Sequence, residues 1–239
     1  MKLSVQARKW HKWVALVIGV QVLLWTASGL FMSFVPIDTV HSEDFIKKDE
    51  PLFFSDLKHY VSLENAAKNL NSDFGKIGEV KLRHVLDFPV FEFKNDLGRT
   101  ALVNAESGEL MSPLSENLIR KIVLSRYSGS QLIRSIGLIH DPVIEYRGKY
   151  PVWRVDFDNS DSTSFYIQPD DGELKAVRGT IWRIYDFLWM LHIMDYSERD
   201  NFNHWWLIVA AFLGFTVSIS GFVLFFYSFR KRDFFFKKK

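Results

Sequence analysis

Two stretches without a charged side chain lie near opposite ends of the sequence. Residues 13–35 and residues 205–229 are almost entirely apolar and carry aromatic residues at their edges. As helices rising about 1.5 Å per residue, both are long enough to cross a hydrocarbon layer of about 30 Å. The first is too long for the apolar part of a cleaved signal peptide, and no A-x-A-like site follows it. The pattern therefore predicts two transmembrane helices.

The region between these stretches shows an internal duplication with strand-like alternation. One copy begins Phe-Pro-Val at Phe88 and the other Tyr-Pro-Val at Tyr150, and both end in Gly-Glu-Leu. In each, alternating apolar residues precede a polar turn and a second short strand, which predicts a β-hairpin. Serine residues that can cap a helix stand ahead of each hairpin, at Ser62 and Ser115. We therefore expect a helix followed by antiparallel strands, used twice, in a membrane protein of the α+β class.

The distribution of charge predicts the topology. All acidic residues except Asp233 lie between residues 36 and 204, so the middle of the chain is acidic although the formal net charge is +2. Basic residues occupy the two flanks: Lys2, Arg8, Lys9 and Lys12, then Arg230, Lys231, Arg232, Lys237, Lys238 and Lys239. Because basic flanks stay in the cytoplasm, we expect both termini there and the middle region outside, in the periplasm of a bacterial inner membrane. Positive charge on membrane flanks also argues against nucleic acid as a partner.

These patterns divide the chain into seven segments. The predicted boundaries are a cytoplasmic N-terminus at 1–12, a transmembrane helix at 13–35, a first repeat unit at 36–112, a second at 113–180, an interfacial amphipathic segment at 181–204, a transmembrane helix at 205–229 and a basic cytoplasmic tail at 230–239.

The repeat unit resembles the PepSY domain. The resemblance rests on an aromatic-x-Val strand, a turn and a strand that ends in Gly-Glu-Leu. The first membrane segment is similar to that of PepSY-associated transmembrane proteins, through Arg8, His11, Trp13, Leu16, Gly19, Ser28 and Gly29. This resemblance implies an extracytoplasmic tandem of two PepSY-like units between two membrane helices. Some members of the family take part in iron acquisition and ferric siderophore reduction, with haem held by membrane histidines, but larger members have four or more membrane helices.

Three histidines near the membrane segments are candidate axial ligands of haem b: His11, His192 and His204. Neutral imidazole is a usual axial ligand, and two ligands at similar depth are required. For His11 the alternative is an interfacial residue among lipid headgroups. His192 shares a helical face with Trp182, Tyr185 and Trp189, which is either an aromatic belt or the wall of a cofactor pocket. His41 is a further candidate on the outer side, whereas a second ligand beside His11 must come from another chain.

Other chemistry is not indicated. The chain has no cysteine, which excludes disulfides and thiolate sites, and it has no P-loop, Rossmann glycine pattern, HExxH or G-x-S-x-G motif. A stripe of small residues, Ala210, Gly214 and Ser218, suits close helix contact within the chain, in a homodimer or with a partner subunit. Gln21 is the one strongly polar residue deep in the first span.

Two functions therefore remain open. The first is a haem-binding electron-transfer or redox-partner subunit linked to iron or siderophore reduction or to respiration, as the resemblance implies; whether it is itself an enzyme the sequence leaves open. The second is a non-enzymatic, membrane-anchored binding or regulatory module, either an assembly factor or one similar to a peptidase inhibitor.

Overall fold

The computed structural model of the chain describes residues 3–47, 59–130 and 132–228. The chain divides into two compact units: a helical unit formed by Met1–Pro36 with Ile184–Lys239, and a sheet unit formed by Ile37–Arg183. Two long helices and two antiparallel sheets confirm the predicted α+β class. The basic tail predicted at residues 230–239 lies outside the described residues.

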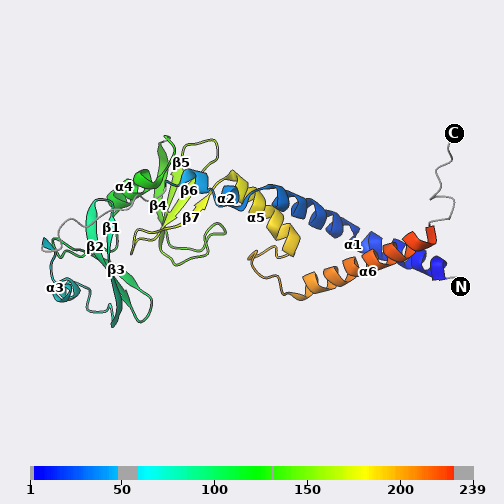
Figure 1. The fold of residues 1–239 in the computed structure, drawn as a ribbon, viewed down its shortest axis with the longest axis horizontal. Coiled ribbons are helices and arrows are strands. Elements are labelled where there is room, and N and C mark those ends of the chain that lie inside the picture. The colour runs from blue at the N-terminus through cyan, green and yellow to red at the C-terminus, as the bar shows by residue number, and fades with distance from the viewer. Residues whose placement is uncertain (1–2, 48–58, 131, 229–239) are drawn as a thin grey trace. The chain divides into compact units, whose positions relative to one another are not determined.

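The helical unit is built mainly from two long helices, α1 (Leu3–Phe34) and α6 (Trp205–Ser228) (Figure 1). Both are long and apolar enough to cross a membrane. Their apolar side chains are turned outward, since Leu16 is 69% exposed, Val20 71% and Phe212 68%. A core helix of a soluble protein would bury such residues. Helix α1 begins at Leu3, so most of the segment predicted as a separate N-terminus continues the helix.

A third helix, α5 (Thr180–Ile193), covers the first part of the segment predicted to be interfacial. It begins in the sheet unit and ends in the helical unit, because the boundary falls between Arg183 and Ile184. Residues 194–204, which connect it to α6, are not helical.

The sheet unit contains two sheets, each preceded by a helix (Figure 1). The first group is α3 (Leu63–Lys68), β1 (Ile77–Val85), β2 (Phe88–Asn95) and β3 (Thr100–Asn104). The second is α4 (Glu116–Arg126), β4 (Ile133–Ile139), β5 (Val152–Phe157), β6 (Ser164–Ile167) and β7 (Leu174–Arg178). Two short helices, α2 (Ile37–Val40) and η1 (Glu43–Phe45), precede both groups. Strands follow chain order in each sheet, β1-β2-β3 and β4-β5-β6-β7.

Cross-strand register confirms the predicted pair of hairpins and extends the duplication. Phe91 pairs with Val103 in the first sheet, and Trp153 pairs with Ile167 at the corresponding place in the second. The preceding strands match as well, because Leu82 pairs with Phe91 and Leu138 with Trp153. Even the irregularity in register recurs, between Ile77 and Glu79 in β1 and between Ile133 and Ser135 in β4. The repeat is therefore a helix and three strands rather than a helix and a hairpin.

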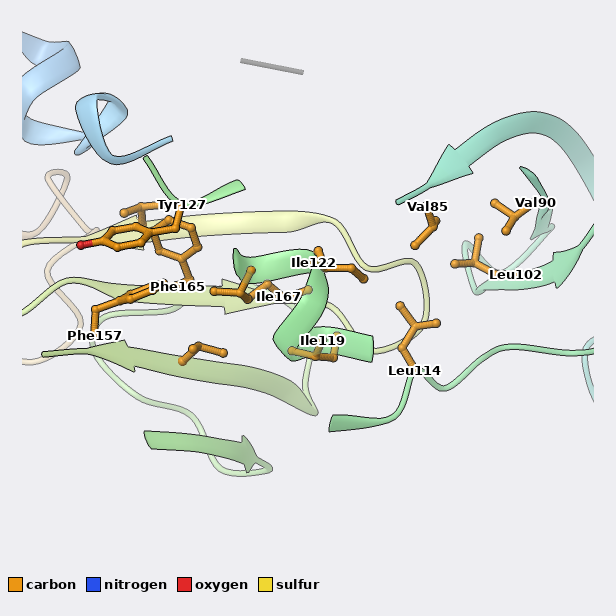
Figure 2. Packing of buried hydrophobic residues seen from close by; sticks show 13 residues of the cluster. Val85, Val90, Leu102, Leu114, Ile119, Ile122, Tyr127, Phe157, Phe165 and Ile167 are labelled. Atoms are coloured by element: carbon orange, nitrogen blue, oxygen red, sulfur yellow. The ribbon is translucent and has the colours of Figure 1, made fainter. Parts of the chain in front are cut away.

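The main hydrophobic core of the sheet unit joins both sheets. Figure 2 shows Tyr127, Phe157 and Phe165 gathered on the second sheet, and Val90 and Leu102 of the first sheet at the other end of the cluster. Tyr127 stacks on Phe157 with ring centroids 3.8 Å apart. Burial of large aromatic rings supplies much of the driving force for folding. The shared core holds the two repeats together as one unit.

Residues 37–47 pack against the second repeat, although the sequence assigned them to the first. Ile46 forms a β-bridge with Tyr127, and the backbone N–H of Lys47 donates to the carbonyl of Arg126 at 2.7 Å. Phe45 stacks on Tyr127 as well. The predicted boundary follows chain order, whereas the segment's contacts with Arg126 and Tyr127 at the end of α4 place it on the second repeat.

Candidate histidine sites

One stripe of α1 carries the residues that organise the helical unit. His11, Val14, Ile18, Gln21, Trp25 and Ser28 follow one another at alternating spacings of three and four residues, and all are buried or half-buried. This spacing keeps a packed seam on one side of a helix. Three of the six are polar and a fourth, Trp25, carries an indole N–H, within a largely apolar span, and this is the sequence signal for a site.

His11 lies against α6 near the N-terminal end of this stripe. Its Nδ1 is 2.8 Å from the Oγ of Ser220, and Ser220 Oγ also donates to the carbonyl of Val217 at 2.9 Å. A hydroxyl carries one proton, so both contacts are satisfied only when His11 donates from Nδ1–H to Ser220. We therefore assign His11 the tautomer that leaves its lone pair on Nε2.

The space for His11 is provided by Gly221. A Cβ atom added at Gly221 would lie 3.3 Å from the Cε1 of His11. The close approach of ring and helix backbone therefore depends on the glycine that follows Ser220.

His192, near the end of α5, has the same arrangement with Ser28 of α1. His192 Nδ1 is 2.8 Å from Ser28 Oγ, and Ser28 Oγ donates to the carbonyl of Leu24 at 2.7 Å. The same proton count assigns Nδ1–H to His192 and the lone pair to Nε2. The ring lies nearly parallel to that of Trp189, with centroids 6.4 Å apart. The aromatic face predicted for α5 therefore includes the histidine.

Two side chains of α1 and that of His204, the residue before α6, satisfy the last carbonyls of α5. Gln21 Nε2 donates to the carbonyl of Leu191 at 3.0 Å, and Trp25 Nε1 to that of His192 at 2.6 Å. His204 Nε2 bonds the carbonyl of Ile193 at 2.9 Å. The carbonyls at a helix end lack partners within the helix. Gln21, the strongly polar residue deep in the first apolar segment, is thus an interhelical hydrogen-bonding residue.

His204 caps α6 rather than presenting a nitrogen for coordination. Its Nε2 is used on Ile193, and its Nδ1 accepts a hydrogen bond from the backbone N–H of Leu207 at 3.3 Å. A side chain that accepts from the third residue of a helix is an N-cap. Because both ring nitrogens are engaged, His204 does not fit the role of an axial ligand in this arrangement.

The connection between α5 and α6 is folded around Asp195. This carboxylate accepts hydrogen bonds from the backbone N–H groups of Asn201, Asp200, Ser197 and Glu198. Hydrogen bonds of this kind, that from Asn201 above all, lower the pKa of Asp195. The turn fixes the distance between the ends of the two helices and so brings His204 to Ile193.

The two serine-bound histidines each offer one nitrogen, and they are far apart. Ser28, which bonds His192, is separated along α1 from His11 by a helix segment about 25 Å long at 1.5 Å per residue. One iron atom has its two axial ligands a few ångströms apart, on opposite sides. His11 and His192 of one chain therefore belong to two different sites. His41 lies in the sheet unit, and among the described residues no group of three or more His, Asp or Glu is placed to hold a metal ion.

Packing of α6 on α1 uses part of the stripe of small residues. A Cβ atom at Gly214 would lie 3.2 Å from the Cζ3 of Trp25, and Ala210 is only 5% exposed. Ser218, on the same stripe, is exposed. Contact between α6 and α1 within the chain thus explains the small residues at Ala210 and Gly214.

Comparison with known proteins gives no relative. No protein-family model, no curated protein and no solved structure matches the chain.

Proposed function

We propose that the chain is an electron-transfer subunit of a bacterial inner membrane, in which His11 and His192 each supply one axial ligand to a b-type haem. The observation that carries the proposal is the paired histidine–serine arrangement. Metal-bound histidines commonly donate their other ring N–H to a neighbouring acceptor, which fixes the tautomer and the ring orientation. Both histidines already have this form.

In this proposal α1 and α6 cross the membrane with both termini in the cytoplasm. His11 then lies near the cytoplasmic face, and His192 near the periplasmic face, on the same side as the sheet unit. The basis is the exposed apolar surface of the two helices and the basic residues at the chain ends. The resemblance of the repeats to PepSY-like units supports the same orientation.

Bound haem supplies one-electron redox chemistry. The chain's own residues hold the imidazoles: Ser220 and Ser28 accept from Nδ1 and direct Nε2 outward from the bond, and the ring of Trp189 lies parallel to that of His192. Each site has one ligand in one chain, so the second must come from outside it. We propose a second copy of the chain as that source, which makes the functional form a homodimer with one site near each face. Such a pair of sites would provide a path for electrons across the membrane, which would serve ferric siderophore reduction or respiration.

The test is haem content per folded chain after expression in haem-replete cells and purification in detergent. The proposal expects a Soret band and about one haem per chain, since two chains share two sites. His11→Ala and His192→Ala should each lose about half of the haem, and the double variant nearly all. His140→Ala, which removes a histidine of the sheet unit outside both sites, serves as the control and should retain it. A folded, colourless wild type, or full retention in the double variant, would overturn the proposal.

A membrane-anchored binding module is the second candidate function. It is favoured by a cleft of 610 Å³ in the sheet unit, lined by both repeats. Ligand sites are typically clefts of this size. If the wild type binds no haem, this function remains.

A further inference from the structure

The cleft in the sheet unit lies where the two repeats face each other. Lys81 and Lys94 line it from the first sheet, and Arg147, Lys149, Lys175 and Arg178 from the second repeat. The part of the lining that the structure describes also contains four acidic residues: Glu92, Asp170, Asp171 and Glu173. Basic side chains therefore outnumber acidic ones by six to four.

Three of the four acidic groups form ion pairs, and so does one of the cations, because Lys81 Nζ lies 3.1 Å from Oε1 of Glu79, which does not line the cleft. Glu92 forms an ion pair with Arg83, which belongs to the same sheet and does not line the cleft. Lys175 bridges the other two, with its Nζ 3.3 Å from Asp171 and in contact with Glu173. The fourth, Asp170, has a raised pKa because it is partly buried and lies beside Asp171. Arg83 and Glu79, which do not line the cleft, offset each other, so the lining keeps an excess of two positive charges.

The remaining cations are placed to act on a ligand. Lys149 Nζ donates to the carbonyl of Gly98 at 2.6 Å, across from one repeat to the other. An ammonium has three donors, so this contact positions the group while two donors stay available. Lys94, on the first sheet, is exposed. Arg178 is held in place by the carbonyl of Glu145 at 2.7 Å and by the ring of Trp182, 4.2 Å from its Cζ.

Neutral polar groups complete the lining. Tyr146 is only 4% exposed, and its hydroxyl donates to Gln168 Oε1 at 3.4 Å. Burial raises the pKa of the Tyr146 phenol, so it remains a neutral hydrogen-bonding group. A concave surface with an excess of one charge concentrates the field within it and favours ligands of the opposite charge.

We propose that this cleft binds a small oxyanion with at least two negative charges, carried by carboxylate or phosphate groups, between Lys94 of one repeat and Lys149 of the other. The pairing explains why the site needs the duplication: one repeat supplies each cation. The proposal does not depend on haem, and it stands or falls separately from the redox function.

Isothermal titration of the full chain in detergent tests it, with citrate and pyrophosphate as separate probes at constant ionic strength. The wild type should bind at least one of them saturably, and the preferred probe distinguishes a carboxylate from a phosphate ligand. The double variant Lys94→Glu with Lys149→Glu should weaken that binding about tenfold or more. Replacing both by arginine, which keeps the charge, should retain it.

The matched control is Lys76→Glu with Lys121→Glu, which changes the net charge equally at exposed positions outside the cleft. It should change affinity less than about twofold, because screening at moderate salt limits distant charges. Equal weakening by the control would show that binding depends on overall charge only and would overturn the site. Failure of the wild type to bind either probe would overturn it as well.

Discussion

The Nδ1 of His192 lies 2.8 Å from the hydroxyl of Ser28, and the same distance separates His11 Nδ1 from the hydroxyl of Ser220. In both pairs the serine hydroxyl is also bonded to a carbonyl one turn earlier in its own helix. A serine used in this way can only accept from the ring. The two pairs therefore impose the same tautomer at two separated places, and this shared geometry leads to the first prediction.

Ser28→Ala should weaken haem retention about 10- to 100-fold, because loss of the group behind a histidine ligand frees its tautomer and orientation. The measurement is the rate of haem transfer from the purified protein to a haem-scavenging protein in excess. Ser28→Thr keeps the hydroxyl and should restore much of the retention.

Ser33→Ala is the control, since Ser33 is on the same helix and its hydroxyl donates to the carbonyl of Leu30 at 2.8 Å. At the other site Ser220→Ala should behave like Ser28→Ala, and Ser218→Ala, which loses only a bond to the carbonyl of Gly214, like the control. Equal effects of Ser28→Ala and Ser33→Ala would refute the positioning role.

Gly214→Leu should destabilise the pair of long helices by about 1–3 kcal/mol, because a larger side chain has no room against Trp25. Gly19 of α1 has nothing within 4 Å of its Cβ position, so Gly19→Leu should change stability by less than about 0.5 kcal/mol. The free energy of unfolding in a denaturing detergent, followed by helix content, compares the two. Similar losses for both variants would mean that α6 does not pack on α1 through Gly214.

Acid should weaken the sheet unit through Glu145. Burial by itself would raise the pKa of Glu145, but the hydrogen bond and charge of Arg183 and the hydroxyl of Tyr166 outweigh it and lower the pKa below its ordinary 4.5. Because the pKa is lowered on folding, the ionised carboxylate of Glu145 contributes stability that is fully present above about pH 4.5. This contribution is lost as the pH falls through the lower pKa of the folded state. Asp170 and Asp171 have raised pKa values and act in the opposite sense.

Glu145→Gln isolates this contribution. At pH 7 the variant should lose about 1–3 kcal/mol of unfolding free energy, and the difference from wild type should shrink as the pH falls below 4.5. Denaturant titrations followed by tryptophan fluorescence at several pH values measure it. A difference that is independent of pH would contradict the assignment.

The membrane topology is tested by reporter enzymes that work only outside the cytoplasm. Inserted beside Gly98, in the exposed turn where Leu97 is 75% exposed, the reporter should be active. Fused after Lys239 it should be inactive, because basic flanks of membrane segments favour the cytoplasmic side. A cytoplasm-only reporter should give the reverse pattern, and activity of the first reporter at the C-terminal fusion would invert the topology.

Elements that carry their own local signal were predictable, and those defined by a distant partner were not. The hairpins, the cap at Ser62 and both long helices follow from local patterns, whereas Ser115 stands at the N-cap position of α4 without a side-chain cap hydrogen bond. Strand β1 is not predicted by its own sequence, IGEVKLRHV, because its first five residues are exposed and no clear alternation marks a buried face. Its pairing with β2 defines it. Strands β4 and β7 likewise depend on their neighbours.

The candidate sites divide in the same way. His11 and His192 were identifiable as histidines beside apolar segments, but Ser28 and Ser220 are small residues whose role depends on which helix lies opposite. His204 also lies beside an apolar segment, as His11 and His192 do. Its two ring nitrogens, however, are bonded to the carbonyl of Ile193 and the N–H of Leu207. The cleft was not foreseen, since Lys94 and Lys149 come together only through the packing of the repeats.

The capped end of α5 has a consequence for how deeply that helix is seated. An unpartnered carbonyl in hydrocarbon costs several kcal/mol, whereas the last carbonyls of α5 are bonded by Gln21, Trp25 and His204. Polar attachments, rather than apolar surface area, therefore set the vertical register of α5 against α1. Moving α5 by one turn along α1 would break the bonds of Gln21, Trp25 and Ser28 together, so the position of His192 along α1 is fixed in one step.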